Sequence, residues 1–146
     1  MKWEGAPFLR ILIADDHEAV RKGVCAILSS RADVEVCGEA EDGKEAIEKA
    51  NALKPDLIIL DITMPVLSGF EAAREIRKTL PKVPILILSM HESKQLVGEA
   101  KKIGVQGYVT KTQVGSTLLE AVDKLLCQGT FFPELLSRAE SAVQVV

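Results

Sequence analysis

The chain has 146 residues, 47% of them hydrophobic, and 18 lysine and arginine residues against 21 aspartate and glutamate residues, for a net charge of −3 at pH 7. This size and balance fit one globular domain, and basic residues dispersed among acidic ones argue against direct nucleic-acid binding. The apolar runs are too short to span a bilayer and charged residues interrupt the N-terminus, so we expect neither membrane contact nor export.

The three cysteines, Cys25, Cys37 and Cys127, are odd in number and far apart in the sequence. Without a close pair they indicate reduced thiols rather than a disulfide framework. A domain of this length needs no disulfide bond for stability, because folding can bury roughly 70% of the surface of the extended chain. We therefore expect a cytoplasmic protein.

Short apolar runs of strand length alternate along the chain with segments of helical period. The strand-length runs lie at residues 8–14, 34–39, 56–60, 84–88 and 106–109. Segments with one apolar stripe follow them at residues 20–28, 46–53, 70–77, 96–103 and 118–126. The segment 96–103 is the weakest predicted helix, because Gly98 lies inside it.

Strand and helix alternating five times predict parallel strands joined by right-handed crossovers, which is a three-layer α/β sandwich. The runs 57–60 and 85–88 are apolar throughout, as expected of strands covered by helices on both faces. We expect one domain at residues 8–128, with an N-terminal tail at 1–7 and a C-terminal tail at 129–146.

Polar side chains follow four of the predicted strands. Asp15 and Asp16 come after the first strand, Asp61 after the third, Ser89 after the fourth and Lys111 after the fifth. Open parallel α/β sheets bind ligands outside the carboxyl ends of their strands, so these groups should meet at one edge. Three carboxylates about 5 Å apart would repel by roughly 3 kcal/mol per pair at an effective dielectric near 20, so a cation is needed there. Oxygen donors favour Mg²⁺, although each aspartate could instead cap the helix that follows it.

These motifs, in this order, make residues 9–128 similar to the receiver domain of two-component response regulators. The segments Ile-Ala-Asp-Asp-His and Gly-Tyr-Val-Thr-Lys most resemble the NarL/FixJ-like group. The matching positions are the acidic pair Asp15 and Asp16, the phosphoacceptor Asp61, the loop residues Met64, Pro65 and Gly69, the switch residues Ser89 and Tyr108, and Lys111. The resemblance implies a flavodoxin-like (βα)5 sandwich with a parallel five-stranded sheet in the order 2-1-3-4-5.

The resemblance also implies a mechanism. A histidine kinase would donate a phosphoryl group, and Asp61 would accept it beside Mg²⁺. Asp15, Asp16 and Asp61 would hold the ion together with the backbone carbonyl of Thr63. Lys111 would contact the transferred phosphoryl oxygens. Beyond its own phosphorylation and dephosphorylation, such a domain is no enzyme.

In such a domain Ser89 and Tyr108 would form a two-state switch. Ser89 would bond the new phosphoryl group and draw its loop inward, and Tyr108 would then rotate from solvent into the core. The output face would be the fourth helix, the fifth strand and the fifth helix. Two plainer roles stay open, Ser89 as a helix N-cap and Tyr108 as a surface aromatic residue. His17 and His91 flank the same edge, where we expect loop residues rather than metal ligands.

The chain departs from the family pattern at two places. Thr112 stands where most members have proline after the lysine. The family's cis bond there would cost roughly 2.5–4 kcal/mol without proline, which leaves the state of Lys111–Thr112 open. NarL/FixJ-like regulators also usually carry a C-terminal helix-turn-helix, which residues 129–146 are too short to form. We expect these residues to be a tail or the start of a linker to an output domain that this chain lacks.

The expected partners are a histidine kinase and an output domain or downstream protein, and a homodimer stays open. We expect this chain itself to bind no nucleic acid. If a helix-turn-helix domain followed it, the protein would regulate transcription.

Three rival functions share this fold or this chemistry. A Mg²⁺-dependent phosphohydrolase also forms an aspartyl phosphate, but it places a second acid two residues after the nucleophile, where this chain has Thr63. A flavodoxin-like cofactor binder needs a phosphate loop rich in small residues, whereas Asp15 and Asp16 would repel phosphate. A scaffold that is never phosphorylated would not need the complete set of site residues.

Overall fold

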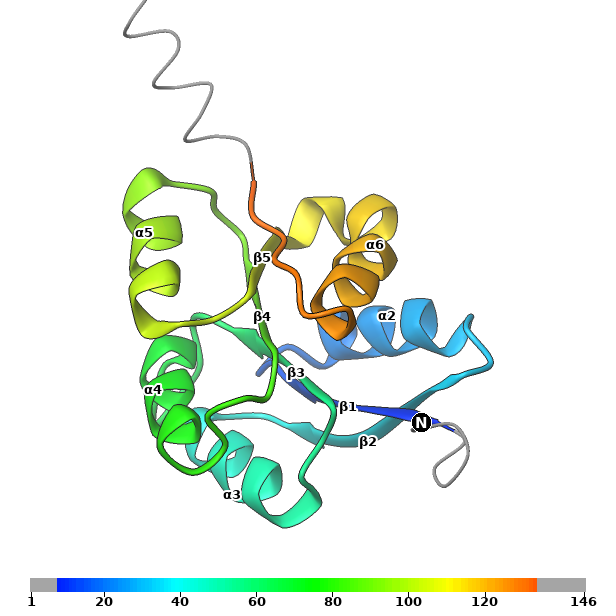
Figure 1. Ribbon diagram of the computed structural model, residues 1–146, viewed down its shortest axis with the longest axis horizontal. Coiled ribbons are helices and arrows are strands. Elements are labelled where there is room, and N and C mark those ends of the chain that lie inside the picture. Colours follow the sequence, from blue (N-terminus) through cyan, green and yellow to red (C-terminus); the bar gives the residue numbers. More distant parts are fainter. Residues whose placement is uncertain (1–7, 134–146) are drawn as a thin grey trace, which may run out of the picture.

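The computed structural model describes residues 8–133, so the predicted N-terminal tail (1–7) and residues 134–146 of the predicted C-terminal tail lie outside the described residues (Figure 1). The elements in chain order are β1 (Leu9–Ala14), α2 (Glu18–Ser29), β2 (Val34–Ala40), α3 (Gly43–Leu53), β3 (Leu57–Asp61), α4 (Gly69–Thr79), β4 (Ile85–Ser89), α5 (Lys94–Ile103), β5 (Gly107–Thr110), the short 3₁₀ helix η1 (Lys111–Gln113) and α6 (Val114–Leu126).

The five strands form one sheet in the order β2-β1-β3-β4-β5, and every neighbouring pair is parallel. In Figure 1, α3, α4 and α5 cover one face of this sheet, and α2 and α6 cover the other. The predicted three-layer sandwich and its strand order are therefore confirmed. The parallel arrangement places the carboxyl ends of all five strands along one edge, where the polar residues follow.

The core consists of two apolar clusters, one on each face of the sheet. Alternation along β3 divides its side chains between them: Ile58 and Leu60 pack towards α3, α4 and α5, while Leu57 and Ile59 pack towards α2 and α6. Every residue of β3 and β4 is buried, which explains their uninterrupted apolar sequences.

Side chains fix the starts of three of the helices. Asp42 caps α3, Ser68 and Glu71 form a reciprocal capping box at α4, and the Ser93 hydroxyl accepts from the Leu96 N–H at α5. No helix within residues 8–133 is both long and apolar enough to cross a membrane.

After α6, the last described residues of the chain pack along the edge of the sheet. We call residues 129–133 the C-terminal strap. The Tyr108 N–H donates to the carbonyl of Phe131 at 2.8 Å, and the Phe131 N–H donates to the carbonyl of Gln106 at 2.9 Å, so Phe131 pairs in parallel with β5 at Gly107. Phe131 packs on the core of α2 and α6, and Phe132 on the core of the opposite face. The strap therefore covers the edge of β5, with one phenylalanine on each face of the sheet. No pattern in the sequence predicted this pairing.

Candidate functional site

The loop between β1 and α2 presents the predicted acidic pair. Asp15 is buried, its N–H donates to the carbonyl of Ala40 at 3.0 Å, and its Oδ1 accepts from the His17 N–H at 2.8 Å. Its Oδ2 is also buried and has no hydrogen bond of ordinary geometry. Asp16 is exposed. The residue at the N-cap position of α2 is His17, so neither aspartate caps that helix and the capping alternative is wrong for both.

Asp61 ends β3, and its carboxylate lies beside the buried ammonium group of Lys111. Asp61 is 3% exposed. Lys111 Nζ lies 3.1 Å from Asp61 Oδ2 and 2.9 Å from Asp15 Oδ2, so one cation bridges the two buried carboxylates. Asp61 caps no helix either, because Ser68 occupies the N-cap position of α4.

The electrostatics of this trio follow from burial. Burial raises the pKa of Asp61 to about 6, the carboxylate of Asp15 adds to this rise, and Lys111 and the Thr63 N–H oppose it. For Lys111, burial disfavours the charged form, but the two carboxylates outweigh it and raise the pKa overall. Lys111 therefore stays protonated, while the negative charge on the pair of aspartates is only partly neutralised.

The loop after Asp61 is packed tightly against the end of β3. The Gly69 N–H donates to the carbonyl of Ile62 at 2.8 Å, and a Cβ at Gly69 would overlap the carbonyl oxygen of Asp61, so a larger residue would displace the Asp61 backbone. Within this loop the Leu67 N–H donates to the carbonyl of Pro65 at 2.8 Å, which closes a three-residue turn around Val66. Val66 has a φ of 70° and is 71% exposed. A β-branched residue with this φ is strained.

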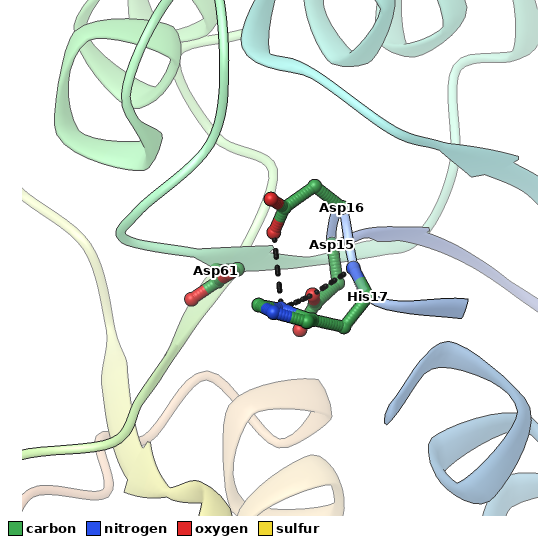
Figure 2. Close-up of side chains that lie close together, drawn as sticks. All are labelled: Asp15, Asp16, His17 and Asp61. Carbon is green, nitrogen blue, oxygen red and sulfur yellow. Dashed lines mark hydrogen bonds and ion pairs between the residues drawn. The ribbon is translucent and has the colours of Figure 1, made fainter. Parts of the chain in front are cut away.

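The imidazole of His17 joins the acidic pair. Figure 2 shows its ring reaching to both carboxylates: Nδ1 lies 3.2 Å from Asp16 Oδ1 and 3.5 Å from Asp15 Oδ1. Asp15, Asp16, His17 and Asp61 each offer one ligand atom, and these atoms all lie within 4.8 Å of one another. His17 is therefore more than the plain loop residue that the sequence predicts, and its position directly after the two aspartates is the signal for this proximity.

The donor set fits a hard divalent cation. Three carboxylates from two strand ends converge, and the buried Asp15 Oδ2, whose one described partner is the Lys111 ammonium, has no hydrogen bond of ordinary geometry and could also accept a metal ion. Lys111 lies against the inner side of this cluster, whereas Asp16 and His17 are on the solvent side. Thr63 is exposed in the loop after Asp61, and its N–H bonds the Asp61 carboxylate.

The two predicted switch residues touch each other at the ends of β4 and β5. Ser89 is buried, its Oγ accepts from the His91 N–H at 3.1 Å, and its side chain bonds the phenol of Tyr108. Tyr108 is 1% exposed and its hydroxyl donates to the carbonyl of His91 at 2.6 Å. The N-cap of α5 is Ser93, so Ser89 as N-cap and Tyr108 as a surface aromatic are both wrong. Tyr108 already occupies the core position to which the switch hypothesis moves it.

Lys111–Thr112 is trans, because no cis peptide bond occurs within the described residues, and these two residues begin η1. Arg21 of α2 was not predicted as a site residue. It is buried, and its Nη1 donates to the backbone carbonyl of Asp15 at 2.7 Å. Its spacing from Val24 and Leu28 on the apolar stripe was the available signal.

Comparison with known proteins gives a consistent result. The family model for the response regulator receiver domain matches residues 11–123. The response regulator protein VraR of Staphylococcus saprophyticus is 38% identical over 137 residues, which cover 94% of this chain and 63% of that protein. This chain thus spans less than two thirds of the length of that relative.

Solved structures agree with this match. A two-component response regulator of the LuxR family from Aurantimonas sp. SI85-9A1 has a TM-score of 0.87 at 30% identity, covering 95% of this chain and 99% of that chain. The isolated REC domain of RcsB from Salmonella enterica serovar Typhimurium, solved in the presence of the phosphomimetic BeF₃⁻, has a TM-score of 0.81 at 28% identity and covers 90% of this chain and 97% of that chain.

Proposed function

Because this chain belongs to the response regulator receiver domain family of two-component signalling, we propose that Asp61 accepts a phosphoryl group from a histidine kinase. The observation that carries this proposal is the position of Asp61, nearly buried at the carboxyl end of a central strand and 3.1 Å from Lys111 Nζ. With a pKa of about 6, the Asp61 carboxyl group is mostly ionised at pH 7 and offers a nucleophilic oxygen.

In the proposed reaction an Asp61 oxygen forms a bond to phosphorus while the bond from phosphorus to the donor's imidazole nitrogen breaks. The electron pair of the broken bond stays on the imidazole. Lys111 would pair with the phosphoryl oxygens, and the contact of its ammonium with the accepting carboxylate supports this role. No proton needs to leave Asp61, so this reaction does not require a second acid at position 63, where this chain has Thr63.

We propose that Asp15, Asp16 and Asp61 hold Mg²⁺ by their carboxylates, together with the backbone carbonyl of Thr63. The bound ion would neutralise charge on the carboxylates and on the entering phosphoryl group. Asp15 is fixed by its own backbone and His17 contacts, whereas Asp16 is exposed and free to adjust. The protein thus offers one rigid and one adaptable carboxylate from the same loop.

We propose that the new phosphoryl group competes for the Ser89 hydroxyl, which now bonds Tyr108. Ser89 pairs with Thr110 across β4 and β5, and Lys111 directly follows Thr110. The Ser89 hydroxyl and the Lys111 ammonium would therefore approach the phosphoryl group from neighbouring strand ends. Loss of the Ser89 contact would loosen the hold on the Tyr108 hydroxyl and the carbonyl of His91. The signal would then leave through α5, β5 and α6.

The output and the cellular setting are also proposals. We propose that an output domain or a downstream protein reads this face, with transcription as the output where that domain binds DNA, as the LuxR-family assignment of one similar structure suggests. We further propose a homodimer as one active form, and a cytoplasmic location, which the three free cysteines favour. The described residues would bind no DNA themselves and catalyse only their own phosphorylation and dephosphorylation.

Phosphorylation is tested with a small acyl phosphate and MgCl₂. Intact-mass spectrometry should show the addition of one phosphoryl group to the wild-type chain and none to D61N. The matched control is D33N, which removes an exposed carboxylate paired with Arg31 far from the acidic cluster, and it should be labelled as the wild type is. Undiminished labelling of D61N would show that Asp61 is not the acceptor.

A further inference from the structure

Arg21 is a charged residue buried on the apolar face of α2. It is 7% exposed and lies on the same stripe as Val24 and Leu28. Its guanidinium makes three directed contacts: Nη1 donates to the carbonyl of Asp15 at 2.7 Å, Nε donates to Glu39 Oε1 at 3.0 Å, and Nη2 lies 3.6 Å from Glu41 Oε1. A buried arginine is costly unless it is paired, and here two carboxylates from the end of β2 pair with it.

The carbonyl that Arg21 binds belongs to the peptide unit that joins Asp15 to Asp16. Because a peptide unit is planar, fixing its carbonyl also fixes the nitrogen and the Cα of Asp16, which is the atom from which the Asp16 side chain starts. On the other side of Asp15, the N–H is held by the carbonyl of Ala40. The backbone on both sides of Asp15 is therefore tied to β2, directly at Ala40 and through Arg21 at Glu39.

Only arginine can make this set of contacts. A guanidinium is a rigid planar fork with five donors, so one side chain can bond the Asp15 carbonyl and the Glu39 carboxylate in different directions. A lysine ammonium at the same position carries the charge, but it is a single point that cannot hold both acceptors in a fixed relative geometry. The contact thus depends on the shape of the side chain as well as on its charge.

From this geometry we propose that Arg21 is a positioning residue for the metal site: it clamps the peptide between Asp15 and Asp16 so that both carboxylates face the same cation. The inference rests on the proposed function, because it assumes that Mg²⁺ binds this pair. Arg21 touches neither the metal position nor the acceptor oxygen, and it acts only through the Asp15 backbone.

The test compares R21M with R31M. Arg31 also bridges two carboxylates, Asp33 and Asp123, but it lies beyond the other end of α2 and does not contact the acidic loop. MgCl₂ titrations followed by the amide NMR signals of residues 15–17 and 61–63 give the Kd, and melting without Mg²⁺ gives the stability. R21M should weaken Mg²⁺ binding roughly tenfold, as loss of a group that orients a metal ligand typically does. R31M should change stability while its Kd stays within about twofold of the wild type.

A second variant keeps the inference testable if R21M fails to fold. R21K retains the positive charge between the carboxylates and should still bind Mg²⁺ several-fold more weakly than the wild type, with faster amide exchange at Asp16 and His17. Wild-type Mg²⁺ affinity in R21K, or in a folded R21M, would overturn the positioning role while leaving phosphorylation of Asp61 standing. A wild-type chain that neither binds Mg²⁺ nor accepts a phosphoryl group would overturn the proposed function itself.

Discussion

The carboxyl group of Asp61 sits where its ionised form is unfavourable. Burial, assisted by the Asp15 carboxylate, raises its pKa to about 6, whereas an unfolded chain titrates at about 4. Between these values the folded protein binds more protons than the unfolded chain. The free energy of unfolding therefore falls as pH rises from about 4 to about 6, and this loss persists at pH 7 when no cation is bound.

Removing this charge should stabilise the fold. We expect D61N to raise the free energy of unfolding by about 1–3 kcal/mol at pH 7 in EDTA, and the gain should vanish near pH 4. Urea unfolding of both chains across this pH range measures the difference. D33N is the contrasting control, because Arg31 lowers the pKa of Asp33 and removal of that carboxylate should give no gain at pH 7. A D61N variant less stable than the wild type at pH 7 would contradict the expectation.

Val66 stores backbone strain beside the site. Its φ of 70° suits asparagine or glycine, and its side chain is mostly in solvent, so little packing is lost on substitution. V66N should raise the free energy of unfolding by about 1 kcal/mol, the lower end of the usual cost of such a conformation. V66A, which keeps a Cβ but removes the branching, should give a smaller gain. Thermal melts at one pH compare the three chains, and a destabilised V66N would exclude strain at this position.

At the level of single residues, the groups that directly follow strands could be predicted from the sequence. Asp15, Asp61 and Lys111 meet because parallel strands deliver their carboxyl ends to one edge, and that follows from topology alone. The contacts of Arg21 and His17 depend on the side-chain conformations that these residues adopt once α2 and the loop before it have packed against the sheet. The spacing of Arg21 from Val24 and Leu28 places it on the apolar stripe, but arginine is ordinarily solvated, so the sequence does not reveal which acceptors it contacts.

At the scale of elements, all five predicted strands end within one residue of the observed bounds. The clearest case is β3, whose apolar run lies between Asp56 and Asp61, so there is little freedom in where this strand begins and ends. The pairing of the C-terminal strap with β5 could not be predicted, because a bridge of one residue has no periodicity. In the sequence, Phe131 and Phe132 are simply adjacent aromatic residues. Only the folded sheet, which lies between them, determines that each packs on a different apolar cluster.

Helix α5 is held by few buried residues. Val97 and Ala100 are its only fully buried positions within the described residues, and Gly98 faces open space. G98A should therefore stabilise the helix by about 0.5–1 kcal/mol without a steric clash. If α5 opens locally, amide exchange in residues 97–103 should slow by roughly fivefold.

G23A provides the matched control for G98A. Gly23 lies in α2, where an added Cβ also meets nothing, so its propensity gain should be similar. G23A should leave exchange in α5 unchanged. Equal slowing in both variants would mean that α5 opens only when the whole domain unfolds.

At the scale of the whole molecule, the proposed switch connects the site to one side of the sheet. Ser89, Tyr108 and the carbonyl of His91 form one hydrogen-bonded set, and Tyr108 also bonds the strap through Phe131. Beryllofluoride with Mg²⁺ should therefore change amide exchange between Ser89 and Lys111 and extend to Phe131. D61N treated identically should show no change there. Changes confined to the loops after β1 and β3 would mean that the phosphoryl mimic binds without any transmission through this face.

The C-terminal strap also affects whether the sheets of two molecules can pair edge to edge. Strand β5 is the last strand of the sheet, and an uncovered edge offers backbone donors and acceptors to a strand of another molecule. The backbone of Phe131 pairs with the N–H of Tyr108 and the carbonyl of Gln106, and the side chains of Phe131 and Phe132 pack on opposite faces of the sheet beside that edge. Undocking of the C-terminal strap would therefore leave the backbone of β5, the strand through which we propose that the signal leaves, open to pairing with a strand of another molecule.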